Sequence, residues 1–201
     1  LFAALAGANQ WENLLLYFNA TPFGVNDPLF GKDIGFYVFQ LPLLSHIFGW
    51  FVSLNLFTLV ATAMVYVIRK AVVIRPPQVF SLAPVAKRHL LILVSLFFFW
   101  GVFGSWLSLN EILFAKRGGV FGPGYTDVTT QLWVLKALMV VSVLCGAAIV
   151  AYAFVGKVLI PIVAVGAFAA LFILGRGVYP TFVQKFQVIP NEIVLERPYI
   201  E

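Results

Sequence analysis

The residues best able to do chemistry in this sequence are four carboxylates that lie outside its apolar stretches. Asp27 and Asp33 stand six residues apart, Glu111 closes an apolar stretch, and Asp127 follows a glycine-rich segment. Hard cations such as Ca²⁺ bind about six to eight oxygen atoms, and paired carboxyl groups can act as general acid and base. These four acids are therefore the candidate metal ligands or acid groups, provided that the fold brings them together.

The same acids have a local role available to them. Asp27 precedes Pro28 in a turn, and Asp33 precedes a segment that runs into Phe36 as a helix. Aspartate caps turns and helix starts by accepting hydrogen bonds from backbone N–H groups. The spacing also departs from the D-x-[DN]-x-[DN]-G pattern of a calcium-binding loop. Local capping is therefore the favoured role, and metal binding is the alternative.

Other patterns typical of catalysis or cofactor binding do not occur in the sequence. Cys145 lies in an apolar run, and His46 and His89 are far apart, so no zinc-site spacing is present. No phosphate loop, dinucleotide fingerprint or nucleophile–base motif occurs either. The run 122–127 (GPGYTD) has a faint likeness to a potassium-filter loop, but the residue order differs and a structural turn is favoured. We expect no cofactor.

The composition predicts a membrane protein. Of the 201 residues, 62% are hydrophobic and 10% are charged, and the mean hydropathy is +0.98. Soluble domains are about 45–50% apolar and about 25% charged. A water-soluble fold of this size could not bury so much apolar surface. The fold class that we expect is an all-α, polytopic membrane helix bundle.

Four stretches are long and apolar enough for spanning helices, which need about 20 residues. The expected spans are residues 43–68, 90–113, 132–155 and 159–174. Small residues four apart, such as Gly166 and Ala170, let helices approach closely. The sequence therefore predicts a compact bundle of about four helices.

The basic residues indicate which side each connection faces. Arg69, Lys70, Arg75, Lys87 and Arg88 all lie between the first and second spans, in a segment without any acid. Cytoplasmic loops carry an excess of Lys and Arg. We therefore expect a multi-pass cell-membrane protein with loop 69–89 cytoplasmic and residues 8–41, 114–131 and 179–201 extracytoplasmic. Because the net charge of +5 marks a membrane side, we expect no nucleic-acid partner.

The outer segments contain one further predicted helix. Trp11, Leu14, Leu15 and Phe18 recur at helical spacing after Asn9, which is a candidate cap. An amphipathic helix lying in the membrane interface is expected there, with packing on top of the bundle as the alternative.

The sequence is expected to divide near residue 178. Residues 1–178 form the helix bundle with its outer loops, as a fragment of a longer membrane region. Residues 179–201 contain Pro180, Pro190 and Pro198 and alternate partly in polarity. They predict an extended extracytoplasmic tail.

Several runs in the outer segments resemble a known family. The longest is DPLFGKDIGFYVFQLP at 27–42, and GPGYTDV at 122–128 and ERPYI at 196–200 are further matches. They are similar to uncharacterised protein family 0182, a family of large bacterial membrane proteins. The resemblance implies several N-terminal spans followed by a large soluble part on the outer side, so that the tail 179–201 would lead to a soluble domain outside this sequence. It implies no activity and no functional residue.

Three function classes are open at this point. A scaffold or assembly module that anchors an outer domain is favoured, because charged residues in the spans are sparse. A transporter or channel module is the second class, and it would use a polar face of Ser53, Asn55, Ser105 and Ser108. An outer-face enzyme built on the four acids is the third and least favoured. The expected partners are the lipid bilayer, the missing spans and soluble domain of the same protein, and other membrane proteins.

Overall fold

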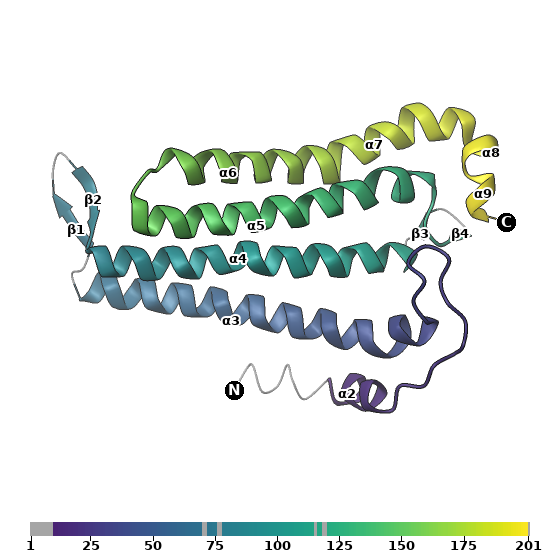
Figure 1. Cartoon of the computed structure of the whole chain (residues 1–201), viewed down its shortest axis with the longest axis horizontal. Helices are drawn as coiled ribbons and strands as arrows, with labels where there is room; N and C mark the ends of the chain where they lie inside the picture. The colour runs from purple at the N-terminus through teal and green to yellow at the C-terminus, as the bar shows by residue number, and fades with distance from the viewer. Residues whose placement is uncertain (1–9, 70–71, 76–77, 115, 118–119, 201) are drawn as a thin grey trace. The chain divides into compact units, whose positions relative to one another are not determined.

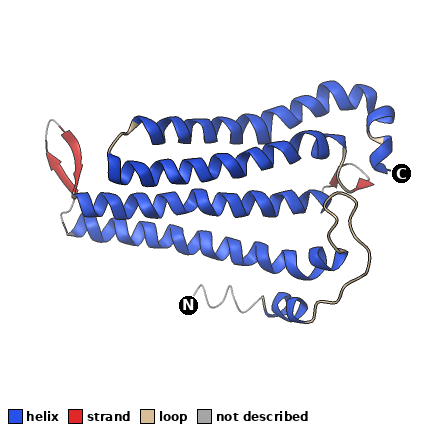
Figure 2. Cartoon of the chain, in the orientation of Figure 1, coloured by secondary structure: helices blue, strands red, loops and turns tan. Residues whose placement is uncertain are grey.

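The computed structural model describes residues 10–69, 72–75, 78–114, 116–117 and 120–200. It divides into two compact units, Leu1–Phe51 and Val52–Glu201. Helices make up most of the described chain (Figure 2). Four helical segments are long and apolar enough to cross a membrane, namely Phe36–Ile68, Pro84–Phe114, Asp127–Val155 and Leu159–Leu195. The expected all-α fold class is confirmed, and the four helices are compatible with a multi-pass membrane protein.

The first unit contains a short helix, an irregular loop and the start of a long helix. Helix α2 spans Trp11–Phe18, and the π-helical turn η1, Phe36–Gln40, leads into α3, Leu41–Ile68. The helix predicted at 11–18 is therefore present, and its apolar side chains are exposed. Its N-cap is Gln10, whose side chain makes no capping bond. The expected cap Asn9 lies outside the described residues, and the interfacial position stays a prediction.

The second unit contains the rest of α3 and three further long helical segments (Figure 1). Helix α4, Pro84–Glu111, ends in the 3₁₀ turn η2, Ile112–Phe114, and α5, Leu132–Val155, follows the π-helical turn η3, Asp127–Gln131. The last segment begins as α6, Leu159–Ala170. Two antiparallel hairpins connect helices, β1 (Val72–Arg75) with β2 (Gln78–Leu82) and β3 (Lys116–Arg117) with β4 (Val120–Phe121).

The predicted extended tail was wrong, and the helix of the fourth predicted span does not end at residue 174. The chain continues after α6 as helical segments up to Ile200, which are η4 (Leu171–Val178), α7 (Tyr179–Val183), η5 (Gln184–Val188), η6 (Ile189–Asn191), α8 (Glu192–Leu195) and α9 (Arg197–Ile200). Pro180 and Pro190 stand in the first turns of α7 and η6, where a missing N–H removes no bond within that segment. The π-helical turns η4 and η5 precede them. The prolines therefore divide a helical tail without making it extended.

Helix ends follow the expected local chemistry in the second unit. Pro84 occupies the first turn of α4, where its fixed φ suits a helix start. Gly156 ends α5 with φ +79°, and its N–H donates to the carbonyl oxygen of Tyr152 at 3.0 Å. A residue with a Cβ rarely adopts that left-handed conformation. Gly156 therefore permits the tight turn from α5 to α6.

Helix α5 is the centre of the second unit, because it packs against α4 and against α6 (Figure 1). Leu138, Cys145 and Ile149 on α5 are buried, as is Leu107 on α4. Cys145 donates from its thiol to the carbonyl oxygen of Ala164 on α6 at 3.0 Å. Apolar packing, together with this hydrogen bond, therefore holds α5 against α4 and α6.

Two polar side chains join other helices of the same unit. The Nδ2 of Asn55 on α3 donates to the carbonyl oxygen of Leu93 on α4 at 3.3 Å. The guanidinium of Arg176 on η4 donates to the hydroxyl of Ser108 on α4 at 3.2 Å. Asn55 is buried, so its amide would be costly to leave without a partner between apolar helices, whereas the bond of Arg176 is exposed. They therefore contribute to helix association.

Glycines mark close approaches, but at positions other than the predicted one. A Cβ at Gly166 would meet nothing within 4 Å in the described part of the chain. A Cβ at Gly175 on η4 would lie 2.9 Å from Cγ1 of Val134 on α5. Gly175 and Val134 are both buried. The last helical segment therefore approaches α5 closely at Gly175.

Replacing Gly175 by Ala should lower the free energy of unfolding by about 1–3 kcal/mol, because the stiff side chain of Val134 has little room to move. Gly177, two residues further on in η4, has nothing within 4 Å of its Cβ position. Gly177→Ala is therefore the matched control, and it should be neutral or slightly stabilising. Thermal unfolding in neutral detergent measures both, and an equal response would contradict the close packing at Gly175.

Candidate functional site

The carboxylate of Asp27 is held by its own loop. Its Oδ1 accepts hydrogen bonds from the backbone N–H groups of Leu29 at 2.9 Å and Phe30 at 2.6 Å. Its Oδ2 accepts from the N–H of Lys32 at 2.9 Å and from the hydroxyl of Tyr37 at 2.7 Å. Four donors thus converge on one buried carboxylate. This geometry is that of a turn cap, because every donor comes from the ten residues after Asp27.

The backbone around Asp27 closes the same turn. The N–H of Asp27 donates to the carbonyl oxygen of Lys32 at 2.8 Å, and the N–H of Gly31 donates to that of Asp27 at 3.0 Å. Gly31 has φ +66°, which is a conformation that favours glycine. The ammonium of Lys32 lies 4.1 Å from the ring centroid of Phe36. The turn is therefore ordered by both its backbone and its side chains.

Asp33 caps a second turn that lies against the first. Its Oδ1 accepts from the N–H groups of Phe23 at 3.0 Å and Gly35 at 2.6 Å, and its Oδ2 accepts from Gly24 at 2.8 Å. A Cβ at Gly35 would lie 2.8 Å from both Asp33 Oδ1 and the carbonyl oxygen of Thr21. Only glycine fits at residue 35 without a shift of the loop backbone. Asp33 therefore fixes the segment that leads into η1.

The hydrogen bonds also set the charge of this loop. Burial acts to raise the pKa of Asp27, but the bonds from Phe30, Tyr37, Lys32 and Leu29 together outweigh it, so the pKa lies below its usual value of 3.8. The bonds from Phe23, Gly35 and Gly24 likewise lower the pKa of Asp33. Partial burial lowers the pKa of Lys32, although the charge of Asp27 acts in the opposite direction. Both aspartates are therefore charged at neutral pH.

Asp127 has a comparable role in the second unit. Its Oδ2 accepts from the N–H of Gly124 at 3.0 Å, while its own N–H donates to the carbonyl oxygen of Gly124 at 3.0 Å. Asp127 and Thr126 are fully buried. The run 122–127 is therefore a structural turn, and Asp127 is also the first residue of η3.

This turn is joined to the helical tail by two side chains that the sequence did not single out as site residues. The N–H of Tyr125 donates to Oε2 of Glu196 at 2.9 Å, and the hydroxyl of Thr126 donates to Oε1 of Gln184 at 2.5 Å. We call these four residues the loop–tail contact. Glu196 and Gln184 lie 71 and 58 residues from their partners, so no local spacing could reveal the pairing.

The four acids considered as candidate metal ligands have different surroundings. Asp27 and Asp33 face backbone donors of the first unit, Asp127 faces Gly124, and Glu111 is exposed at the last residue of α4. Among the residues that the structure describes, no three His, Cys, Asp or Glu side chains lie close enough together to hold a metal ion. Metal binding by these acids stays a prediction.

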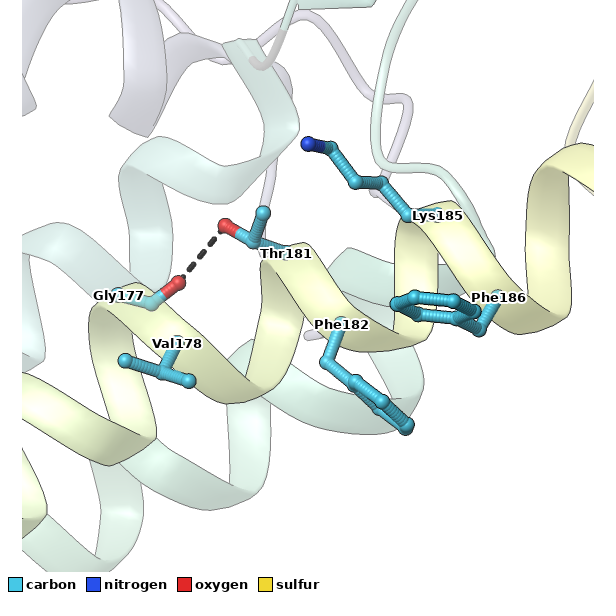
Figure 3. A pocket seen from close by; sticks show the side chains of 6 residues that line it. All are labelled: Gly177, Val178, Thr181, Phe182, Lys185 and Phe186. Atoms are coloured by element: carbon cyan, nitrogen blue, oxygen red, sulfur yellow. Dashed lines mark hydrogen bonds between the residues drawn. The ribbon is translucent and has the colours of Figure 1, made fainter.

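A shallow groove lies on the surface of the last long helical segment (Figure 3). It is lined by six residues of one helical run, Gly177, Val178, Thr181, Phe182, Lys185 and Phe186. The hydroxyl of Thr181 donates to the carbonyl oxygen of Gly177 at 2.8 Å, and the rings of Phe182 and Phe186 are 4.7 Å apart. With one ammonium and two phenyl rings on a helix surface, the groove has no convergent catalytic groups.

The sequence profile of an uncharacterised protein family, UPF0182, matches residues 1–201. The chain belongs to this family. A UPF0182 protein from Trichlorobacter lovleyi is 38% identical over 100% of the chain, which covers 22% of that protein. UPF0182 proteins from Geobacter sulfurreducens and Thermobifida fusca are 36% and 34% identical over 100% and 99% of the chain, which covers 22% and 20% of their lengths.

Membership of UPF0182 confirms the resemblance seen in the sequence. The chain spans about a fifth of the length of these UPF0182 relatives. The family description names no activity. No solved structure matches the chain. The function therefore has to be argued from the residues.

The pH dependence of the first-unit loop should follow from its two aspartates. Their pKa values in the folded chain lie below 3.8, so the stability that they contribute is fully present above 3.8 and is lost as the pH falls through the folded pKa values. Carboxyl NMR titration in detergent micelles should give midpoints below 3.8. Hydrogen exchange at the Phe30 amide should accelerate as Asp27 becomes protonated.

The variant Asp27→Asn serves as a control for that experiment. It removes the titrating group, so exchange at Phe30 should lose the acid transition specific to Asp27. Glu12→Gln, which changes an exposed acid on α2, should leave the transition in place. A midpoint for Asp27 at or above 3.8 would contradict the hydrogen-bonding role.

Proposed function

We propose that this chain is a membrane-anchoring scaffold module of a larger UPF0182 protein. Its apolar helices would hold the protein in the bilayer, and its acid-capped loops would form a preordered platform for the rest of the polypeptide. The observation that carries the proposal is the saturation of Asp27 and Asp33 by donors of their own loop. Carboxylates that accept three and four hydrogen bonds in this way stabilise a loop and offer little to a substrate.

The polar groups of the helices support the same proposal. Asn55 and Ser108, two members of the polar face considered for a transport path, bond to Leu93 and Arg176 on neighbouring helices. Groups used in this way stabilise helix association. The groove at 177–186 is open and apolar, and suits packing better than chemistry.

The loop–tail contact suits an anchor. Tyr125 and Thr126 bond to Glu196 and Gln184, and the ring of Tyr125 meets that of Tyr199 edge-on, with centroids 6.3 Å apart. These contacts give the helical tail a defined direction where it passes the loop. In a longer protein, a tail with a defined direction would position the polypeptide attached to its C-terminal end.

The scaffold proposal can be tested in the full-length protein with two glycine variants. Gly35→Ala should distort the first-unit loop, because the new Cβ would lie 2.8 Å from the carbonyl oxygen of Thr21. We expect the variant to reach the membrane but to expose the remaining polypeptide to limited proteolysis. Gly49→Ala, whose Cβ would meet nothing within 4 Å, should behave as wild type. A protease pattern unchanged by Gly35→Ala would overturn the platform role.

The sidedness of the anchor gives a separate prediction. We propose that loop 69–89 is cytoplasmic and that residues 114–131 are extracytoplasmic, because the acid-free loop carries five basic residues and one long helix, α4, separates the two. Reporter fusions at Pro76 and Pro123 should therefore report opposite sides of the membrane. Reporters active on the same side at both positions would contradict the proposed topology.

A further inference from the structure

One end of the second unit places cations on aromatic rings. The ammonium of Lys87, in the first turns of α4, lies 4.2 Å from the ring centroid of Tyr152 near the end of α5. The guanidinium carbon of Arg88 lies 5.6 Å from the ring centroid of Phe154. We call these four residues the basic corner. Contacts with the ring faces hold both cations beside the turn that joins α5 to α6.

Within the described part of the second unit, no carboxylate stands near the basic corner in the sequence. The sequence has no acid between Asp33 and Glu111 and none between Asp127 and Glu192. Glu111 lies 24 residues beyond Lys87 on the same helix, which places it about 36 Å away. Arg69 and Lys157 stand at neighbouring helix ends and add further positive charge. An anion from outside this unit would balance this charge.

The helix start strengthens the attraction for an anion. The unbonded N–H groups at the N-terminus of α4 carry partial positive charge, and no acidic residue stands in its first turn. The charges of Lys87 and Arg88 would be repelled by this partial positive charge if no anion lay beside them. A phosphate group beside Lys87 and Arg88 would compensate all of these charges at once.

The surface beside the cations is apolar. Val85 is 73% exposed, Phe154 is 63% exposed and Val155 is 64% exposed. A free phosphate would leave these side chains uncovered, whereas the acyl chains of a lipid would cover them. Lys and Arg side chains typically reach from such apolar surfaces to the headgroup layer. Charge and apolarity together favour a lipid over a soluble anion.

We propose that the basic corner binds the phosphate headgroup of an anionic phospholipid, whose acyl chains lie against Val85, Phe154 and Val155. Lys87 and Arg88 contact the phosphate, and Tyr152 and Phe154 hold the two cations in place. This site is independent of the proposed scaffold function, because it is built from residues far along the helices from the acid-capped turn at Asp127.

The test is binding of a fluorescent phosphatidylglycerol to the purified protein in neutral detergent, compared with phosphatidylcholine that carries the same label. Tighter binding of phosphatidylglycerol, weakened by salt, is expected. Lys87→Gln combined with Arg88→Gln should weaken it roughly 25-fold, since each cation contributes about fivefold at an anionic lipid surface. Lys136→Gln combined with Lys185→Gln removes the same charge elsewhere and should leave the affinity unchanged.

Two further arms make the result decisive. The exchange Lys87→Arg with Arg88→Lys keeps both charges and should retain binding, and each single Gln variant should lose about fivefold if the double variant does not fold. Inorganic phosphate should compete weakly. Equal affinity for the two lipids, equal loss in the Lys136 and Lys185 control, or full displacement by inorganic phosphate would each overturn the lipid site.

Discussion

The hydrogen bond from backbone N–H to an aspartate carboxylate is the interaction on which the ordered loops of this protein depend. Such a loop lacks the regular ladder of a helix, so its backbone donors need other acceptors. The carboxylates of Asp27, Asp33 and Asp127 each act as such an acceptor. The loops of Asp33 and Asp127 lead directly into the π-helical turns η1 and η3, and then into the long helices α3 and α5. The acid-capped turns therefore define where two of the long helices begin.

Charge is satisfied differently at the two ends of the second unit. At the end that contains Asp127, carboxylates face backbone donors, and Glu196 connects the turn to the tail. At the other end, Lys87 and Arg88 face aromatic rings, and no acid stands near them in the sequence. Carboxylates accept up to four hydrogen bonds from nearby N–H groups, whereas a cation needs an anion or a π face. One end thus uses its carboxylates as acceptors for its own backbone, and the other presents cations that can meet negative charge.

Between these ends, the helices rely on close contact more than on polar bonds. α5 is covered by α4 and by the last helical segment, and Gly175 permits an approach that any Cβ would obstruct. Asn55 and Arg176 each add a hydrogen bond to a neighbouring helix. Closely packed side chains leave few voids, so the helices have little room to shift against one another. This combination of a packed bundle and preordered loops agrees with the scaffold function that we propose.

The sequence by itself determined the helical class, the four long apolar helices and the family. It also determined the short helix at 11–18 and the turns at 27–33 and 122–127. Apolar runs, helical spacing and turn residues predict these features because they act locally. It did not predict the helical tail, since prolines are compatible with both a chain break and the first turn of a new helix. Only the tertiary structure decided which donors bond to Asp27 and Asp33. It also decided that Glu196 and Gln184 bond to Tyr125 and Thr126. The close approach of two helices at Gly175, and not at Gly166, likewise came from the structure alone. These contacts depend on distances between segments far apart in the chain, or on the path of a loop, and neither leaves a periodic signal in the sequence.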